Sequence, residues 1–452
     1  MELTETKRKL FIFTLLAGTF TMSISQSALS TAYPALMHFF TVDAATIQWL
    51  TTGFMLMMCV MMPVSPWLLN NISFKHLYLS VLALFGIGTL MIIFAPIFWF
   101  ALLGRLLEAT AVGILFPSFQ TVLMTITPKD KRGQTMGAAG LVMGSALAVG
   151  PIISGIVLNF LRWQALFWLF CFLMLVIFLA ACVTISDVME QKPSQLDVFS
   201  LFYEGAGLGM VLYALTAFKD PAHLLSSVLL LLLGLGLLIA FCQRQLKLAE
   251  PLLELRIVKY LAFDIGLLLT GLSYVSLIVV TIVFPLYYQK ILGLSPLASG
   301  LSLVLPAVLL SVLNPITGKL ADKWGFKSVL LVGVSMLLSG WAGLLLWQDH
   351  LGLPLLIAFS MVIEGGNAFV MMPATTLGAN SVPKNLIAHA TALTTTIRQL
   401  LGSLGVMGAT LLLSSAGQSI TQKSSYSRVF ICFLLIEAIA LVLALRLKEV
   451  KK

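Results

Sequence analysis

The chain has 452 residues, of which 59% are hydrophobic and only 10% are charged. Soluble globular domains carry about 25% charged residues, so this composition excludes that class and predicts an integral membrane protein. The net charge of +9 is not a nucleic-acid signal, because the basic residues gather in alternate short loops and not in one patch.

Apolar segments of about 20 residues, the length that crosses a bilayer as a helix, recur from one end of the chain to the other. We predict fourteen transmembrane helices at residues 10–33, 45–69, 75–95, 98–125, 134–158, 163–186, 199–218, 223–243, 261–288, 296–321, 327–347, 352–377, 388–414 and 427–447. Most basic residues then fall on one side, which places both termini in the cytoplasm by the positive-inside rule. The other side holds only Arg162, Lys219, Lys290, Lys423 and Arg428.

Two glutamates occupy matching positions inside these apolar segments. Glu108 stands nine residues before Pro117, and Glu364 stands nine residues before Pro373. A carboxylate in the middle of a transmembrane helix costs about 2.5–3.5 kcal/mol on insertion scales, so such residues usually mark an ion or substrate path. Their repetition predicts a transporter with a proton-linked or cation-linked site between two related halves.

A second internal match supports the same repeat, since the segment 63–75 aligns with the segment 315–327. We therefore predict an N-terminal six-helix half at residues 1–186 and a C-terminal six-helix half at residues 261–452. Residues 187–260 are predicted to be a connector with two extra transmembrane helices. The predicted fold class is all-α, with a pseudo-symmetric core of two six-helix halves.

The loop between the tenth and eleventh predicted spans carries Gly318, Asp322, Gly325 and Lys327 in the order G-x-L-A-D-x-x-G-x-K. This pattern closely resembles the signature of the major facilitator superfamily. Its glycines permit a tight turn and close helix approach, and its aspartate suits a helix N-terminus. The resemblance implies a cytoplasmic gate that is closed when the transporter faces outward. In the matching loop of the first half, Asn70 replaces the aspartate, so a charge-based latch there must be weak.

The fifth predicted span holds Gly150, Pro151 and Gly155, with Ala146 and Ser154 at two positions where glycine is expected. This stretch resembles the antiporter signature of the same superfamily. Small residues let helices pack closely, and proline kinks a helix. The resemblance implies an exporter, and the alternative is a motif for helix packing alone.

Local stretches such as Pro251–Arg256 and Arg398–Gly405 look like the 14-span drug:proton antiporters, and the match covers nearly the whole chain. The resemblance implies a proton-driven efflux antiporter of the bacterial cytoplasmic membrane. It would lie in the lipid bilayer and export amphipathic, cationic or neutral drugs or dyes by alternating access. We expect a monomer with no nucleic-acid partner. We also expect no cofactor or metal, because the chain has no phosphate-binding G-x-x-x-x-G-K-[ST] loop and no His/Cys/Asp cluster.

Arg105 and Glu108 stand three residues apart in the fourth span, so they share a helix face. The resemblance implies a role of this arginine in proton coupling, and we assign that role to Glu108, Arg105 and Glu364. An ionised Glu108 can hold a cationic substrate, and a protonated one can release it. The alternatives are a structural ion pair at Glu108 and a hydrogen-bonded structural acid at Glu364.

Three other acids in the apolar segments are expected to have different roles. Glu437 lies near the middle of the last span, which is a support helix in this architecture, so we expect a structural role. Glu204 and Asp264 lie near the ends of their spans, where we expect water to reach them.

In the superfamily the first and fourth spans of each half line the substrate cavity. Aromatic faces attract cations by about 0.5–2 kcal/mol, and polar side chains orient a substrate. The predicted cavity residues are Gln26, Tyr33, Phe116, Gln120, Tyr274, Asn367 and Phe369.

One alternative function is a proton-coupled exporter of a single metabolite, antibiotic or lipid, built on the same fold. A membrane enzyme or sensor is a different class. The sequence argues against it, because no catalytic constellation and no soluble domain is recognisable.

Overall fold

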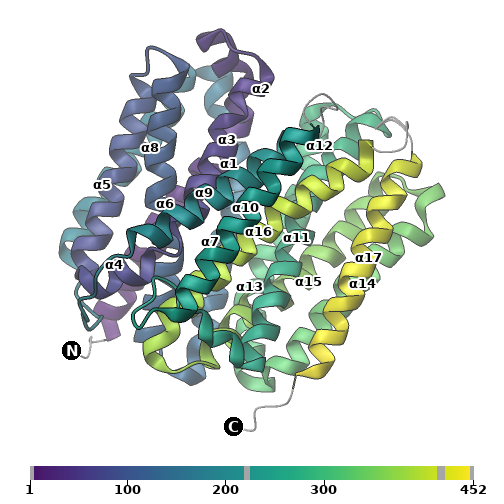
Figure 1. Ribbon diagram of the computed structural model, residues 1–452. Coiled ribbons are helices and arrows are strands. Elements are labelled where there is room, and N and C mark those ends of the chain that lie inside the picture. The colour runs from purple at the N-terminus through teal and green to yellow at the C-terminus, as the bar shows by residue number, and fades with distance from the viewer. Residues whose placement is uncertain (1–4, 218–223, 415–422, 448–452) are drawn as a thin grey trace. The chain divides into compact units, whose positions relative to one another are not determined.

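The structure is a computed structural model that describes residues 5–217, 224–414 and 423–447. Four basic residues that entered the topology prediction, Lys219, Lys448, Lys451 and Lys452, lie outside these ranges. The helices in the first part of the chain are α1 (Glu5–Phe40), α2 (Ala44–Ile47), α3 (Trp49–Met61), α4 (Ser65–Asn71), α5 (Phe74–Ile93), α6 (Phe98–Ile126), α7 (Arg132–Phe160) and α8 (Trp163–Thr184) (Figure 1). Those that follow are α9 (Val198–Ala217), α10 (Leu224–Lys247), α11 (Leu261–Lys290), α12 (Pro296–Ser302), α13 (Val304–Trp324), α14 (Phe326–Leu346), α15 (Leu353–Asn380), α16 (Ile387–Ser414) and α17 (Lys423–Arg446).

Among the described residues the predicted apolar segments are helical, with breaks inside 45–69 and 296–321, as expected where a bilayer offers the backbone no water to bond. Twelve helices of the described ranges are long and apolar enough to cross a membrane, or thirteen if α3 and α4 form one span. Those two helices meet at an angle of 51° around Pro63, whose ring and missing N–H break the helix. The predicted number of fourteen spans is not confirmed, since twelve or thirteen helices qualify within the described ranges.

The chain forms two compact units that are not contiguous in sequence. Unit 1 comprises Met1–Ile126, Val149–Ile257 and Lys384–Thr395, and unit 2 comprises Thr127–Ala148, Val258–Pro383 and Thr396–Lys452. Helices α7 and α16 are therefore each divided between the units. The predicted boundaries at residues 186 and 260 follow the sequence repeat, whereas the units follow packing.

The core of unit 2 is built by α11, α14, α15 and α17. Trp341 on α14 is fully buried at its centre, with its ring centroid 4.9 Å from that of Phe433 on α17. Helices α14 and α15 approach closely at Gly333 and Gly366, where a Cβ on Gly366 would lie 2.8 Å from the carbonyl oxygen of Gly333. Small residues at this contact bring the two backbones together without any side chain between them.

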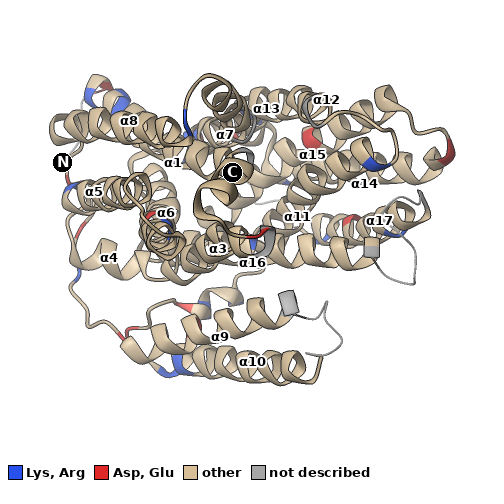
Figure 2. Cartoon of the chain, turned by 90° about the horizontal axis from the view of Figure 1, so that it is seen from above, with Lys and Arg blue, Asp and Glu red and all other residues tan. Residues whose placement is uncertain are grey.

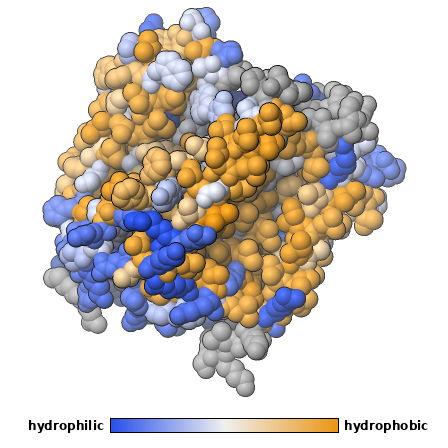
Figure 3. Space-filling model, in the orientation of Figure 1, coloured by the Kyte–Doolittle hydropathy of each residue, from blue (hydrophilic) through white to orange (hydrophobic). Residues whose placement is uncertain are grey.

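The two extra helices, α9 and α10, lie side by side within unit 1, and α9 is the one that contacts α3 (Figure 2). A Cβ on Gly234 of α10 would lie 2.9 Å from the carbonyl oxygen of Gly207 of α9, so the pair is tightly packed. The outer face of α10 is exposed and apolar at Leu225, Leu229 and Leu233. Hydrophobic residues dominate the middle of the face that Figure 3 shows, as expected for a surface in contact with lipid.

Polar contacts of the connector, residues 187–260, join it to other segments of unit 1. The backbone N–H of Lys192 donates to the carbonyl oxygen of Asn70 over 3.0 Å, and the backbone N–H of Lys75 donates to Asp187 Oδ1 over 2.9 Å. These bonds tie the connector to the last turn of α4 and the first turn of α5. Asn70, which replaces the aspartate of the signature, takes part through its backbone carbonyl.

A bidentate ion pair joins the residue that precedes α9 to the last turn of α10. Arg244 Nε donates to Asp197 Oδ2 over 2.7 Å, and Arg244 Nη2 donates to Asp197 Oδ1 over 2.9 Å. Beyond it, the backbone N–H of Leu253 donates to Gln245 Oε1 over 3.0 Å, and that of Glu254 donates to His389 Nδ1 of α16 over 3.2 Å. Polar contacts thus run through the connector from the α4–α5 loop to the beginning of α16.

We predict that Asp197→Asn loosens the α9–α10 pair. Hydrogen bonds from Arg244 hold the pKa of the Asp197 carboxyl below its usual value. The contact therefore contributes stability above the unfolded pKa of about 3.9, and this is lost as the pH falls through the lower folded value. Half-exposed pairs contribute about 1 kcal/mol or less, so the expected effect is a small drop in thermal stability and faster proteolysis of the connector at neutral pH. Glu190→Gln, which removes an exposed acid of the same connector, is the control, and equal effects of both changes would contradict the prediction.

Candidate functional site

Glu108 and Arg105 form a buried ion pair on α6. Arg105 Nη1 donates to Glu108 Oε2 over 2.5 Å, and Thr89 Oγ1 of α5 donates to Glu108 Oε1 over 2.6 Å. Glu108 is 0% exposed and Arg105 is 1% exposed. Both carboxylate oxygens are therefore engaged, and the charge of the glutamate is balanced inside the helix bundle.

Close approach of α5 and α6 makes this contact possible. A Cβ on Gly88 would lie 2.6 Å from the carbonyl oxygen of Gly104 and 3.0 Å from the backbone nitrogen of Glu108. Any larger residue at Gly88 would push the helices apart, and Thr89 would move away from the carboxylate. The glycine pair is thus a condition for the hydrogen bonding of Glu108.

The guanidinium of Arg105 has further partners on α3. Its Cζ lies 4.0 Å from the centroid of the Phe54 ring, and its Nε donates to the carbonyl oxygen of Leu50 over 3.4 Å. The hydroxyl of Tyr33 of α1 hydrogen bonds to Thr51, the residue that follows Leu50. One predicted cavity residue, Tyr33, therefore contacts the same segment of α3 as Arg105.

Glu364 has a different environment in unit 2. Asn367 Nδ2, one turn along α15, donates to Glu364 Oε2 over 3.3 Å, and Ser273 Oγ of α11 donates to Asn367 Oδ1 over 2.7 Å. Glu364 is buried, and none of the ion pairs found in the described ranges includes it. Two predicted residues, Glu364 and Asn367, are brought together, but as an acid with neutral partners.

Glu437 lies in the core of unit 2 and accepts a bond from a neighbouring helix. Ser276 Oγ donates to Glu437 Oε1 over 2.5 Å, and Trp341 Nε1 donates to Ser276 Oγ over 3.2 Å. This chain of bonds joins α14, α11 and α17. The other carboxylate oxygen, Oε2, has no hydrogen-bond partner among the described residues, and the structural role of Glu437 stays a prediction.

The expectation that water reaches Glu204 is wrong in this structure. Its side chain is only 2% exposed, because α9 packs against α3. Its Oε2 has no hydrogen-bond partner among the described residues. Asp264 is half-buried, as expected near a helix end.

The predicted cavity residues of α1 and α6 do not all gather at Glu108. Phe116 and Gln120 follow Glu108 by eight and twelve residues, which is about 12 and 18 Å along a helix. Gln120 is fully buried, and its two side-chain polar atoms have no partner within the part of the chain that the structure describes. Gln26 is half-buried on α1, seven residues before Tyr33 and so on the same helix face.

Tyr274 and Phe369 occupy separate places in unit 2. Tyr274 of α11 faces α16, where its hydroxyl donates to Gln399 Oε1 over 3.2 Å. Phe369 of α15 faces α14, because a Cβ on Gly333 would lie 2.6 Å from the Phe369 Cβ. Phe369 therefore packs against a neighbouring helix on a different side from Asn367, which bonds to α11.

The predicted gate residues form a close contact with the start of α7. Asp322 Oδ1 and Oδ2 accept the backbone N–H groups of Gly133 and Gln134 over 2.9 and 2.8 Å. The first N–H groups of a helix have no partner within it and attract negative charge, so this carboxylate caps α7. Gly318 contacts Gly133 so closely that neither position has room for a side chain.

The other two predicted gate residues do not take part in this contact. Gly325 ends α13 with φ of +89°, a conformation that favours glycine. Lys327 is half-buried without a described bond.

In the antiporter motif on α7, Gly150 packs closely against α1, whereas Gly155 has no close neighbour. A Cβ on Gly150 would collide with Ser27 Oγ and lie 3.0 Å from the backbone nitrogen of Ala28 on α1. A Cβ on Gly155 would meet nothing within 4 Å, so the close approach that we expected there is absent. Pro151 lies inside α7, which continues from Arg132 to Phe160.

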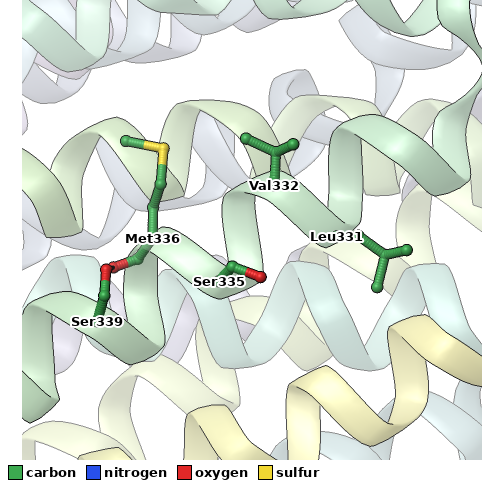
Figure 4. Close-up of a pocket in the computed structure, with 5 residues that line it drawn as sticks. All are labelled: Leu331, Val332, Ser335, Met336 and Ser339. Atoms are coloured by element: carbon green, nitrogen blue, oxygen red, sulfur yellow. Dashed lines mark hydrogen bonds between the residues drawn. The ribbon is translucent and has the colours of Figure 1, made fainter.

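A hollow of about 540 Å³ lies on the surface of α14, and its residues all come from this one helix: Leu331, Val332, Ser335, Met336 and Ser339 (Figure 4). None of them is ionisable, and Ser339 Oγ already donates to the carbonyl oxygen of Met336 over 2.9 Å. It offers nothing to couple a proton. Over the described ranges, no group of three His, Cys, Asp or Glu side chains is arranged to hold a metal ion.

Comparison with known proteins places this arrangement in a family. The model of the Major Facilitator Superfamily matches residues 15–406. The chain is 34% identical to the uncharacterized MFS-type transporter YcnB of Bacillus subtilis, over 88% of this chain and 84% of that protein. It is 32% identical to the lincomycin resistance protein LmrB of Listeria monocytogenes, over 89% of this chain and 86% of that protein.

A solved structure of the proton:xylose symporter XylE has the same fold, with a TM-score of 0.71 at 11% identity, covering 99% of this chain and 98% of that one. The chain therefore belongs to the major facilitator superfamily. It is a multi-pass membrane transporter and not an enzyme.

We predict that Gly88→Ala destabilises the protein by about 1–3 kcal/mol, since the new methyl meets backbone atoms that cannot give way. Thermal unfolding of the purified protein measures this. Gly86→Ala on the same helix is the control, because a Cβ there meets nothing within 4 Å. It should be neutral or slightly stabilising, and an equal loss in both variants would show that the α5–α6 contact is not the cause.

We predict a similar contrast within the antiporter motif. Gly150→Ala forces Ser27 to move and crowds the backbone of α1, so it should cost about 1 kcal/mol or more and slow transport. Gly155→Ala should leave both stability and transport close to wild type. A larger effect at Gly155 than at Gly150 would contradict the packing described above.

Proposed function

We propose that the chain is a proton-driven efflux antiporter of the 14-span drug:proton antiporter family. Its substrates would be amphipathic small molecules, cationic or neutral, that it exports by alternating access. The observation that carries the proposal is the buried Glu108–Arg105 pair on α6, with both carboxylate oxygens bonded. The name of the relative LmrB, a lincomycin resistance protein, supports drug efflux.

The exchange chemistry follows from the contacts of Glu108. When ionised, the carboxylate is held by Arg105 and Thr89 and neutralises the guanidinium, so a cationic substrate is not repelled from this region. When a proton binds, the carboxyl loses its charge and its hold on the guanidinium weakens. Proton uptake and cation release are then two consequences of one event, as antiport requires. Arg105 lies against the ring of Phe54, so its movement would be transmitted to α3.

We assign a second role to Glu364. It lacks an arginine partner, and only Asn367 Nδ2 bonds to its Oε2. An acid of this kind can contact a cationic group directly, without first displacing a guanidinium. Glu108 would then respond to the proton and Glu364 to the substrate, with the aromatic residues of the cavity determining affinity.

The membrane topology that we propose has fourteen spans, with the α3–α4 pair as one span and α9 as another. Both termini would lie in the cytoplasm of a bacterial cell, and the protein would act as a monomer in the cytoplasmic membrane. Residues 1–186 and 261–452 would be the two halves, and residues 187–260 a connector. The contact of Asp322 with the start of α7 would be the closed cytoplasmic gate.

A narrower exporter is the second candidate. The name of LmrB mentions one antibiotic, which favours a protein that exports a single compound class by the same proton-coupled mechanism. Substrate range separates the two candidates, since both would use the same acids.

We predict that ethidium leaves energised vesicles in response to an imposed proton gradient in the wild type and that Glu108→Gln abolishes this efflux. The reason is that glutamine keeps the size of the side chain but cannot take up a proton. Glu364→Gln should weaken dye binding and retain proton-dependent transport of dye at high concentration.

Thermal unfolding of each purified variant is the control for folding, and ethidium binding to Glu108→Gln shows that the substrate site is intact. Efflux that persists in Glu108→Gln would move the proton site elsewhere. Absence of efflux in the wild type, together with gradient-driven transport of lincomycin, would favour the narrower exporter.

A further inference from the structure

Arg398 on α16 is a buried cation without a charged partner. It is 2% exposed, and its Nε and Nη1 have no hydrogen-bond partner among the residues that the structure describes. None of the ion pairs in those ranges includes it. Arg105 is equally buried but is balanced by Glu108 three residues away.

A guanidinium stays protonated in proteins, so Arg398 cannot avoid its charge by losing a proton. Buried charges are strongly unfavourable unless they are paired and hydrogen-bonded. Ionisable residues at membrane depth accordingly tend to mark functional sites. The unpaired N–H donors of Arg398 therefore suit the acceptor oxygens of a molecule that the transporter binds.

Two neighbours fix the orientation of this donor group. The Cζ of Arg398 lies 5.3 Å from the centroid of the Tyr274 ring of α11, and the Tyr274 hydroxyl bonds to Gln399 Oε1 over 3.2 Å. Gly402 lets the ring pack on α16, since a Cβ there would lie 2.6 Å from Tyr274 Cε1. The ring attracts the guanidinium from one side, and the N–H groups in the plane of the guanidinium remain available to a ligand.

We propose that Arg398 is a subsite for a carboxylate on the transported molecule, with Tyr274 contacting its apolar body. This inference rests on the proposed export function and extends its substrate class. Compounds that carry an acidic group on an aromatic frame should bind, in addition to cations. Arginine suits this task because its planar group presents several N–H donors to the oxygens of a carboxylate.

The test is equilibrium binding of fluorescein and of fluorescein methyl ester, which differ only at the carboxylate, to the purified full-length protein. The wild type should bind fluorescein more tightly than the ester. Arg398→Gln should weaken fluorescein binding by about tenfold or more, the size expected for a charged hydrogen bond, and leave the ester unchanged. Arg398→Lys, which keeps the charge but not the planar fork, should lie in between.

Arg446→Gln is the matched control, because it removes an exposed arginine at the end of α17 and should not affect either dye. Equal affinity of the wild type for the two dyes would overturn the proposal, and this comparison needs no variant to fold. Equal weakening of both dyes in Arg398→Gln would also overturn it, since the arginine would then have only a structural role.

A lipid phosphate has similar oxygen chemistry, so the binding is repeated with added phosphatidylglycerol. Dye binding that the lipid does not displace supports the subsite for a small molecule, and displacement assigns Arg398 to a lipid headgroup and overturns the proposal. The assay uses no proton gradient. Failure of ethidium efflux would therefore remove the proposed function and leave the difference between the two dyes intact.

Discussion

The Glu108–Arg105 ion pair is the interaction on which the account of this transporter depends. Removing one partner of a buried pair costs about 3–5 kcal/mol, because the other charge is left without compensation. The second carboxylate oxygen is bonded because Gly88 and Gly104 bring α5 close enough for Thr89 to reach it. Backbone packing, hydrogen bonding and charge balance are therefore one connected constraint. A proton that binds Glu108 acts on all three, which is how a local titration can alter helix packing.

The two units treat charge differently. In unit 1 the acid and the arginine are neighbours on one helix and balance each other. In unit 2 the acid Glu364 and the arginine Arg398 are on different helices, α15 and α16, and neither takes part in an ion pair in the described part of the chain. The repeat thus keeps a carboxylate at the matching position in both units, but only in unit 1 is this carboxylate paired with an arginine. We infer that unit 1 responds to protons and that unit 2 contacts charged groups of the substrate.

The sequence predicted the positions of the helices and the nearness of Arg105 to Glu108, because both follow from hydropathy and from spacing along one helix. It did not predict Thr89 as a partner, since the distance between α5 and α6 depends on tertiary packing. The same limit explains Glu204, which lies near a helix end but is buried by α3, and Gly155, which belongs to a packing motif but faces open space. Spacing identifies a helix face, but it does not identify the helix that covers it. The sequence indicated Arg398 only as part of a stretch that resembles the antiporter family, and the structure shows that its Nε and Nη1 have no hydrogen-bond partner among the described residues.

Proton release on substrate binding tests the central claim most directly. Purified protein in a weakly buffered solution with a pH indicator is mixed with ethidium, and the protons released per bound dye are measured for the wild type and for Glu108→Gln. The account predicts release from the wild type, with none from the variant at matched dye occupancy. Equal release from both proteins would contradict it, because the exchanging proton would then belong to another group.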